Sequence, residues 1–72
     1  MYLTPKIEEI RERRLAADLS QYGLSKKAGL GGQAINRIES GETATIHPLR
    51  AKEIAKALGC GVEDIFTKTK GA

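Results

Sequence analysis

The stretch over residues 19–41, LSQYGLSKKAGLGGQAINRIESG, constrains the fold more than any other part of this chain. Apolar residues recur at helical spacing on both sides of a glycine. They are Leu24, Ala28, Ile35 and Ile38. Gly29 breaks the pattern between the two halves, and Leu30 follows it. Two short helices whose apolar faces turn inward around a glycine corner form a helix-turn-helix. We therefore expect this motif over about residues 20–40, with Leu30 filling the corner.

Further start and stop signals predict three more helices around this motif. Thr4-Pro5 and His47-Pro48 each combine a capping side chain with a proline suited to the first helical position. Gly29 and Gly59 suit left-handed C-caps. We expect Ser20 to cap the second helix, the third to run from about Gly32 to Glu39, and Gly61 to open the fifth. Buried stripes are expected at Ile7, Ile10, Leu15 and Leu19, at Leu49, Ile54, Ala55 and Leu58, and at Val62, Ile65 and Phe66.

Length and composition predict one small domain over residues 1–72. Seventy-two residues support a single modest core, no strand pattern is evident, and the tail over about residues 67–72 is expected to fray. Cys60 is the only cysteine and His47 the only histidine, which excludes an internal disulfide and a conventional metal site. We expect no cofactor and no enzymatic activity, because no base–nucleophile or carboxylate pair is evident to line a pocket. Cys60 is interpreted as a core thiol and His47 as a helix cap or surface residue.

The chain also carries no membrane or export signal. No apolar run approaches the roughly 18 residues that span a bilayer. The N-terminus, MYLTPKIEEI, lacks the basic-then-apolar layout of a signal peptide. We expect a cytoplasmic protein with no membrane partner.

The net charge of +3 is concentrated in the helix-turn-helix. Residues 1–19 carry four bases and four acids, and residues 39–72 carry five of each. Residues 20–38 carry three bases and no acid. These bases are Lys26, Lys27 and Arg37. A local positive field suits a polyanion such as DNA, although three bases on two helices also fit an ordinary solvated face.

On the second helix of the motif, Ile35 and Ile38 face the core, so polar residues occupy the other faces. Gln33 can offer its amide bidentately to adenine, and Arg37, one turn later, can form a fork with guanine O6 and N7. Ala34 is small enough to meet a thymine methyl, and Asn36 is less well aimed. The candidate base contacts are therefore Gln33, Ala34, Asn36 and Arg37, against the alternative that the polar ones are only solvated.

Residues 7–66 resemble the lambda-repressor-like DNA-binding domains of the Cro and xenobiotic-response-element type. The matching stretches are IRERRLAADLSQ, AGL, INRIESG and IAKALGCGVEDIF. The resemblance implies a compact all-α, five-helix fold that binds near-palindromic double-stranded operator DNA, commonly as a dimer. The chain departs from the family pattern at three glycines. Gly31 stands where a Ser or Thr cap is usual, Gly61 stands where a Ser cap is usual, and Gly32 stands where a long base-reading side chain is common.

The resemblance also implies phosphate contacts and one internal ion pair. Gln21 resembles the glutamine that clamps a phosphate at the start of the second helix, where free N–H groups attract an anion; the alternative is a weak cap or exposed side chain. Arg14 resembles the arginine that pairs with a glutamate, here Glu39, at the end of the reading helix. The remaining candidate phosphate contacts are Ser40, Gly41, Thr43, Tyr22 and Lys26, with packing on the first helix as the alternative for Tyr22.

These features together predict a sequence-specific transcriptional regulator, similar to a phage Cro or repressor protein or a stand-alone bacterial regulator. One alternative is an antitoxin that represses its own promoter and binds a toxin. Another is a protein–protein adaptor that has lost DNA binding. We expect a weak homodimer, because one short reading helix with glycines at its start discriminates poorly. Its surface is expected around Cys60-Gly61, the outer side of the fifth helix and the tail from Thr67.

Overall fold

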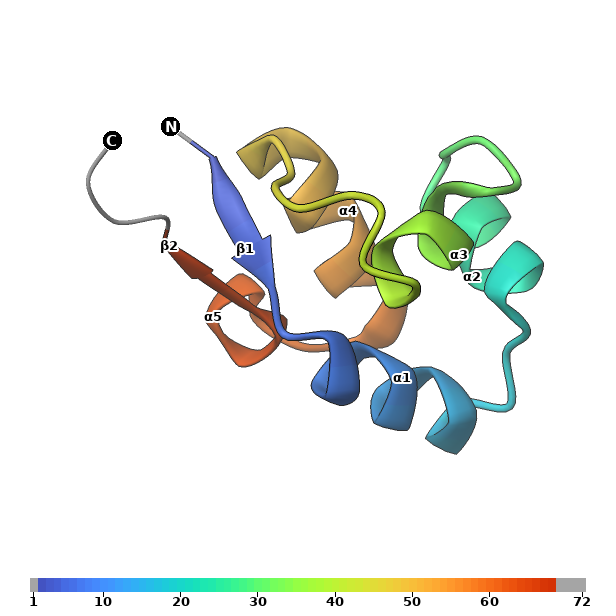
Figure 1. Ribbon diagram of the computed structural model, residues 1–72. Helices are drawn as coiled ribbons and strands as arrows, with labels where there is room; N and C mark the ends of the chain where they lie inside the picture. The colour runs from blue at the N-terminus through green and yellow to red at the C-terminus, as the bar shows by residue number, and fades with distance from the viewer. Residues whose placement is uncertain (1, 69–72) are drawn as a thin grey trace.

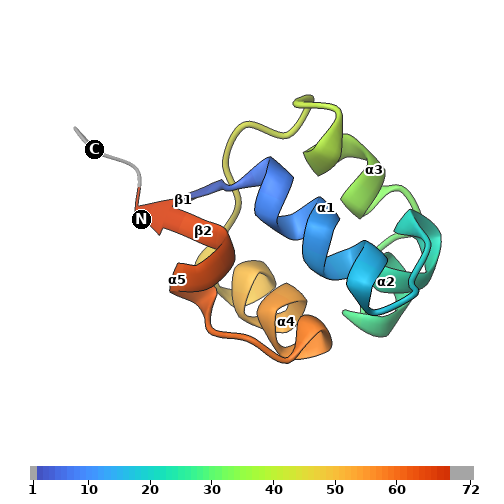
Figure 2. The ribbon, with the colours of Figure 1, turned by 90° about the horizontal axis from the view of Figure 1, so that it is seen from below.

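The computed structural model describes residues 2–68 and contains five helices with a small two-stranded sheet (Figure 1). The helices are α1 (Ile7–Ala16), α2 (Gln21–Lys27), α3 (Ala34–Glu39), α4 (Pro48–Leu58) and α5 (Val62–Ile65). The strands are β1 (Leu3–Pro5) and β2 (Phe66–Lys68). The sheet and α5 lie at one end of the molecule and α2 with α3 at the other (Figures 1 and 2). None of these helices is long and apolar enough to cross a bilayer.

The two strands correct the expectation of an all-α chain. They pair antiparallel, with Leu3 opposite Lys68 and Pro5 opposite Phe66, and Leu3 exchanges two backbone hydrogen bonds of 2.9 and 2.8 Å with Ile46. A three-residue strand is too short to show a two-residue period in the sequence. The expected helix start at residues 4–5 is therefore wrong, and α1 begins at Ile7 instead.

The predicted frayed tail is also partly wrong. Thr67 and Lys68 pair with β1, opposite Thr4 and Leu3. Residues 69–72 lie outside the described residues.

The core follows most of the predicted apolar stripes. The buried apolar side chains are Leu3, Ile10, Leu24, Ala28, Ile35, Ile38, Ile46, Ala51, Ile54, Ala55, Ile65 and Phe66. Leu30 packs partly buried against them at the corner of the motif. These contacts hold α3 against both α1 and α2 and so fix the orientation of the helix expected to read DNA.

Two predicted core residues are wrong, since Leu15 is 61% and Leu49 69% exposed. In α1 the inward pair at i and i+4 is Ile10 and Arg14, which turns Leu15 to solvent. In α4 the inward row at i, i+3 and i+4 starts at Ala51, two residues after Leu49.

The predicted caps are confirmed at four helix ends. Gly23 N–H donates to Ser20 Oγ at 2.9 Å, and Leu49 N–H donates to His47 Nδ1 at 3.1 Å. Gly29 and Gly59 adopt φ of 77° and 71°, the left-handed conformation that glycine accepts without strain. Besides the start of α1, the start of α3 differs, because this helix begins at Ala34, two residues later than Gly32.

Candidate nucleic-acid interface

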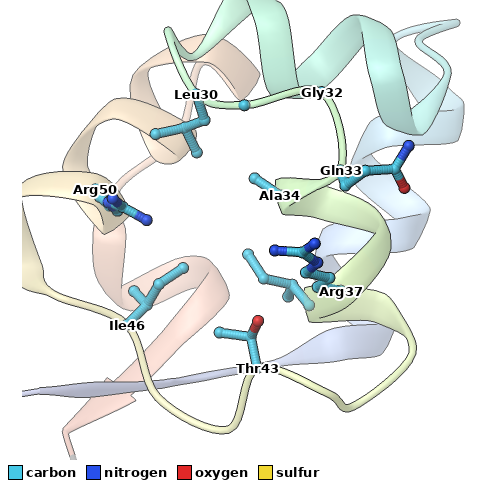
Figure 3. Close-up of a pocket in the computed structure, with 10 residues that line it drawn as sticks. Leu30, Gly32, Gln33, Ala34, Arg37, Thr43, Ile46 and Arg50 are labelled. Carbon is cyan, nitrogen blue, oxygen red and sulfur yellow. The ribbon is translucent and has the colours of Figure 1, made fainter.

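A groove of about 440 Å³ opens between α3, the turn before it, and the start of α4. Gln33, Ala34 and Arg37 line it from the α3 side, and Thr43 and Arg50 line it from the following loop and α4. Figure 3 shows the guanidinium groups of Arg37 and Arg50 entering the groove from opposite walls, while the amide of Gln33 turns away from its centre. The groove thus combines two cations with the polar edge of α3.

Arg37 has one acidic neighbour at the surface. Its Nε lies 3.8 Å from Glu42 Oε2, and both side chains are exposed. Exposed pairs of this kind contribute about 0–1 kcal/mol, so Arg37 can exchange this partner for a stronger one at little cost.

The structure brings Arg14 and Glu39 together beneath α3. Arg14 Nε and Nη2 donate to the two carboxylate oxygens at 2.7 and 3.0 Å, and Arg14 Nη1 donates to the carbonyl of Leu19 at 2.9 Å. Arg11 Nε lies 3.6 Å from the same carboxylate. The pair ties α1 to the last residue of α3. A buried charge pair of this geometry fixes orientation more than it adds stability.

Burial alone would raise the pKa of Glu39. The hydrogen bonds from Arg14 and Gln21, together with the attraction of Arg14 and Arg11, outweigh burial and hold this pKa below its usual value. Glu39 is therefore an anion at neutral pH, and it can only accept hydrogen bonds.

Gln21 and Asn36 extend this cluster to the surface. Gln21 Nε2 donates to Glu39 Oε1 at 2.9 Å, and Asn36 Nδ2 donates to Gln21 Oε1 at 2.9 Å. Gln21 is half-buried and Asn36 is exposed. Gln21 is thus neither a cap nor a free side chain, because it links the buried carboxylate to the outer face of α3.

Ser25 joins α2 to α3 and was not anticipated from the sequence. It is fully buried, its hydroxyl donates to the carbonyl of Gln21 at 2.8 Å, and it accepts from Ile35 N–H at 3.0 Å. This contact supplies a hydroxyl partner in the first turn of α3, where Gly31 offers none. A serine between Leu24 and the lysines reads as a surface residue, so only three-dimensional packing reveals its role.

Tyr22 lies against the turn before α3. A Cβ atom at Gly32 would lie 2.7 Å from Tyr22 Cε1 and 2.9 Å from Cδ1, so the ring occupies the space of a side chain at that position. Tyr22 remains exposed, and Lys26 Nζ lies 6.0 Å from its ring centroid. The two residues, both candidate phosphate contacts, thus sit together beside the start of α3.

The loop after α3 offers fewer donors than its sequence indicates. The N–H groups of Gly41 and Thr43 donate to the carbonyls of Ile38 and Arg37 at 3.1 and 3.0 Å. The Ser40 hydroxyl donates to the Arg37 carbonyl at 3.1 Å. The backbone donors expected to hold a second phosphate and the single hydroxyl proton of Ser40 are therefore already used, which leaves the Thr43 hydroxyl as the candidate donor among these residues.

Arg50 is the residue of this surface that sequence reasoning missed. It lies in a segment whose bases and acids balance, so the charge pattern did not single it out. The one available signal is that Arg50 lies in the first turn of α4, the helix that follows the loop after α3. Among residues 2–68, no group of three or more His, Cys, Asp or Glu side chains could hold a metal ion.

The fold and the polar surface of α3 define a helix-turn-helix protein. Residues 10–65 match the HTH_3 helix-turn-helix model, and the chain belongs to this lambda-repressor/Cro-like family. It is similar to the restriction-modification controller protein C.AhdI from Aeromonas hydrophila, with 26% identity, coverage of 81% of this chain and 86% of that chain, and a TM-score of 0.73. A search of curated proteins finds no match. The family indicates a DNA-binding transcriptional regulator, a class of protein that is generally non-enzymatic.

Proposed function

We propose that this protein is a sequence-specific regulator of transcription whose α3 lies in the major groove of double-stranded DNA. The observation that supports this most is the shared groove of Arg37 and Arg50 beside α3, with the one acid of that helix, Glu39, buried behind it. The groove offered to DNA is therefore lined by two cations, with the exposed acid Glu42 beside Arg37, while the Glu39 carboxylate lies inside the domain. A helix of about 10–12 Å diameter fits a major groove of about 12 Å.

Roles within this surface follow from side-chain chemistry. Arg37 projects from the middle of α3 and is suited to guanine O6 and N7, and Gln33 at its start is suited to adenine. Ala34 leaves room for a thymine methyl. Arg50 comes from a different helix across the groove and is suited to a phosphate of the flanking backbone.

We further propose that the protein acts as a weak homodimer on a near-palindromic operator. The six residues of α3 cover only a few base pairs, so two copies reading half-sites about 34 Å apart would multiply the discrimination. Of the proposed dimer surface, α5 and β2 lie at the end of the molecule opposite α2 and α3 (Figure 1), and the turn at Cys60-Gly61 joins α4 to α5. Analytical ultracentrifugation with and without operator DNA tests this, and one chain bound to an asymmetric site would contradict it.

The similarity to C.AhdI favours a second biological role for the same DNA-binding activity, namely the control of a restriction–modification system. A phage Cro-like or repressor-like role and the control of a restriction–modification system both need a small operator-binding protein. The antitoxin and adaptor alternatives predict different binding results. An antitoxin would bind a toxin as well as DNA, whereas an adaptor would show no salt-dependent DNA binding.

The decisive experiment is selection of bound sequences from random duplex DNA at two salt concentrations. We expect one enriched motif with two-fold symmetry and an affinity that falls steeply with salt. Arg37→Ala should weaken the best site by about 1–3 kcal/mol and relax the choice at one base pair. Arg50→Ala serves as the matched comparison and should weaken all duplexes alike. Absence of any enriched sequence would contradict sequence-specific regulation.

A further inference from the structure

Two side-chain amides connect a buried carboxylate to the exposed face of α3 through hydrogen bonds. Glu39 lies inside the domain, Gln21 stands between, and Asn36 is at the surface. The two linking hydrogen bonds are both 2.9 Å long. We call Glu39, Gln21 and Asn36 the amide relay.

The direction of each hydrogen bond in the relay follows from charge. An ionised carboxylate has no proton to give, so Gln21 must turn its NH₂ group toward Glu39. The carbonyl oxygen of Gln21 then faces Asn36, and Asn36 must turn its own NH₂ group toward that oxygen. As a result Asn36 keeps Oδ1 and one N–H for a partner outside the domain. In the part of the chain that the structure describes, Oδ1 of Asn36 takes part in no hydrogen bond.

Reversing the amide of Asn36 would be unfavourable. A flip would place its Oδ1 against the carbonyl oxygen of Gln21, so that two acceptors would face each other. Gln21 cannot relieve this by flipping as well, because its oxygen would then face the Glu39 carboxylate. Apposed acceptors forfeit a hydrogen bond and repel, so the relay has one favoured orientation.

We propose that Asn36 is a specificity-determining residue that selects adenine at one base pair, with its amide orientation fixed by Glu39 through Gln21. This inference rests on the proposed binding of α3 in the major groove. Adenine presents an N6 amino donor beside the N7 acceptor, which matches an outward oxygen with one N–H beside it. Guanine presents two acceptors, O6 and N7, and so opposes the outward oxygen of Asn36.

The test compares wild type with Asn36→Ala and Gln21→Leu on duplexes in which each base pair of the selected site is varied in turn. Asn36→Ala identifies the base pair that Asn36 reads, where wild type should prefer adenine over guanine by about 5-fold to 100-fold. Gln21→Leu removes the relay and leaves Asn36 in place. We expect it to cut that one preference to within about 3-fold while the preferences at other positions persist. Circular dichroism and thermal melting establish that each variant is folded.

Glu12→Leu is the matched control for replacing a polar side chain by an apolar one. It changes an exposed residue of α1, outside the groove of Arg37 and Arg50 and outside the proposed dimer surface, and should leave every base preference unchanged. A Gln21→Leu variant that binds all duplexes more weakly but keeps the adenine preference would overturn the relay and leave Gln21 as a phosphate contact. Equal losses on all duplexes for Asn36→Ala would overturn its role as a reader. Failure of the wild type to select any sequence would instead overturn the proposed function.

Discussion

Removal of the Glu39 carboxylate should destabilise this domain severely. Glu39→Ala deletes the acceptor of two hydrogen bonds from Arg14 and one from Gln21. The Arg14 side chain is only 11% exposed, so its charge would stay buried without a partner. Stranding a buried charge in this way costs about 3–5 kcal/mol. A chain of this length has a total stability of roughly 4–11 kcal/mol at 0.05–0.15 kcal/mol per residue.

This cost can be measured by thermal and urea unfolding followed by circular dichroism. For a domain of this size, 1 kcal/mol shifts the melting temperature by about 4–8 °C, so the expected fall exceeds about 12 °C. Glu9→Ala is the matched control, because it removes a carboxylate 3.4 Å from Arg13 in a pair whose side chains are 48% and 40% exposed. We expect a fall of less than about 4 °C there, as for other exposed helical pairs.

A double variant separates the stranded charge from the lost pair. Arg14→Met combined with Glu39→Leu leaves no unpaired charge, so it should be more stable than Glu39→Ala by about 2 kcal/mol or more. If Glu39→Ala and Glu9→Ala lower the melting temperature equally, the argument from burial is wrong. If the double variant is less stable than Glu39→Ala, the stranded charge is not the cause of the loss.

Three further outcomes follow from single contacts. Ser25→Ala should cost about 1–3 kcal/mol in urea unfolding, because Ile35 N–H loses its buried acceptor; a loss below 0.5 kcal/mol would contradict this. The lowered pKa of Glu39 contributes stability that is complete above its ordinary value of 4.5 and is lost as pH falls through the folded pKa. The gap in unfolding free energy between wild type and Glu39→Gln should therefore narrow below about pH 4.5, and a constant gap would refute the assignment. Arg50→Ala should reduce the slope of log affinity against log salt by about 1, whereas an unchanged slope would remove Arg50 from the phosphate contacts.

Much of the fold was predictable because most of its helices have start or stop signals in the sequence close to their ends. The caps at Ser20 and His47 and the left-handed glycines act within a few residues, so their signals survive in sequence alone. The β1–β2 pairing joins residues about sixty positions apart through three-residue strands, which leave no periodic signal. Leu15 was placed in the core because hydrophobicity favoured it, whereas the inward position belongs to Arg14, whose charge is matched by Glu39.

The candidate site was predictable in its residue types but not in its connections. The sequence and the family resemblance indicated Gln33, Arg37 and the pairing of Arg14 with Glu39. The bond from Gln21 to Asn36 depends on how closely α2 and α3 approach, and Arg50 enters the groove only because α4 packs beside α3. Such relations arise from tertiary packing and have no counterpart in local spacing.

Because the Tyr22 ring occupies the space beside Gly32, the effects of substitutions at these two positions should depend on each other. A new side chain at position 32 would claim the space that the ring fills, and the exposed ring would swing away at little cost to folding. Such a mutation would therefore exchange one group at the surface proposed to face DNA for another and would not simply add a contact. Its effect on the DNA sequence that is bound should depend on whether Tyr22 is still present. The order in which positions 22 and 32 change would then determine which single variants still bind the operator.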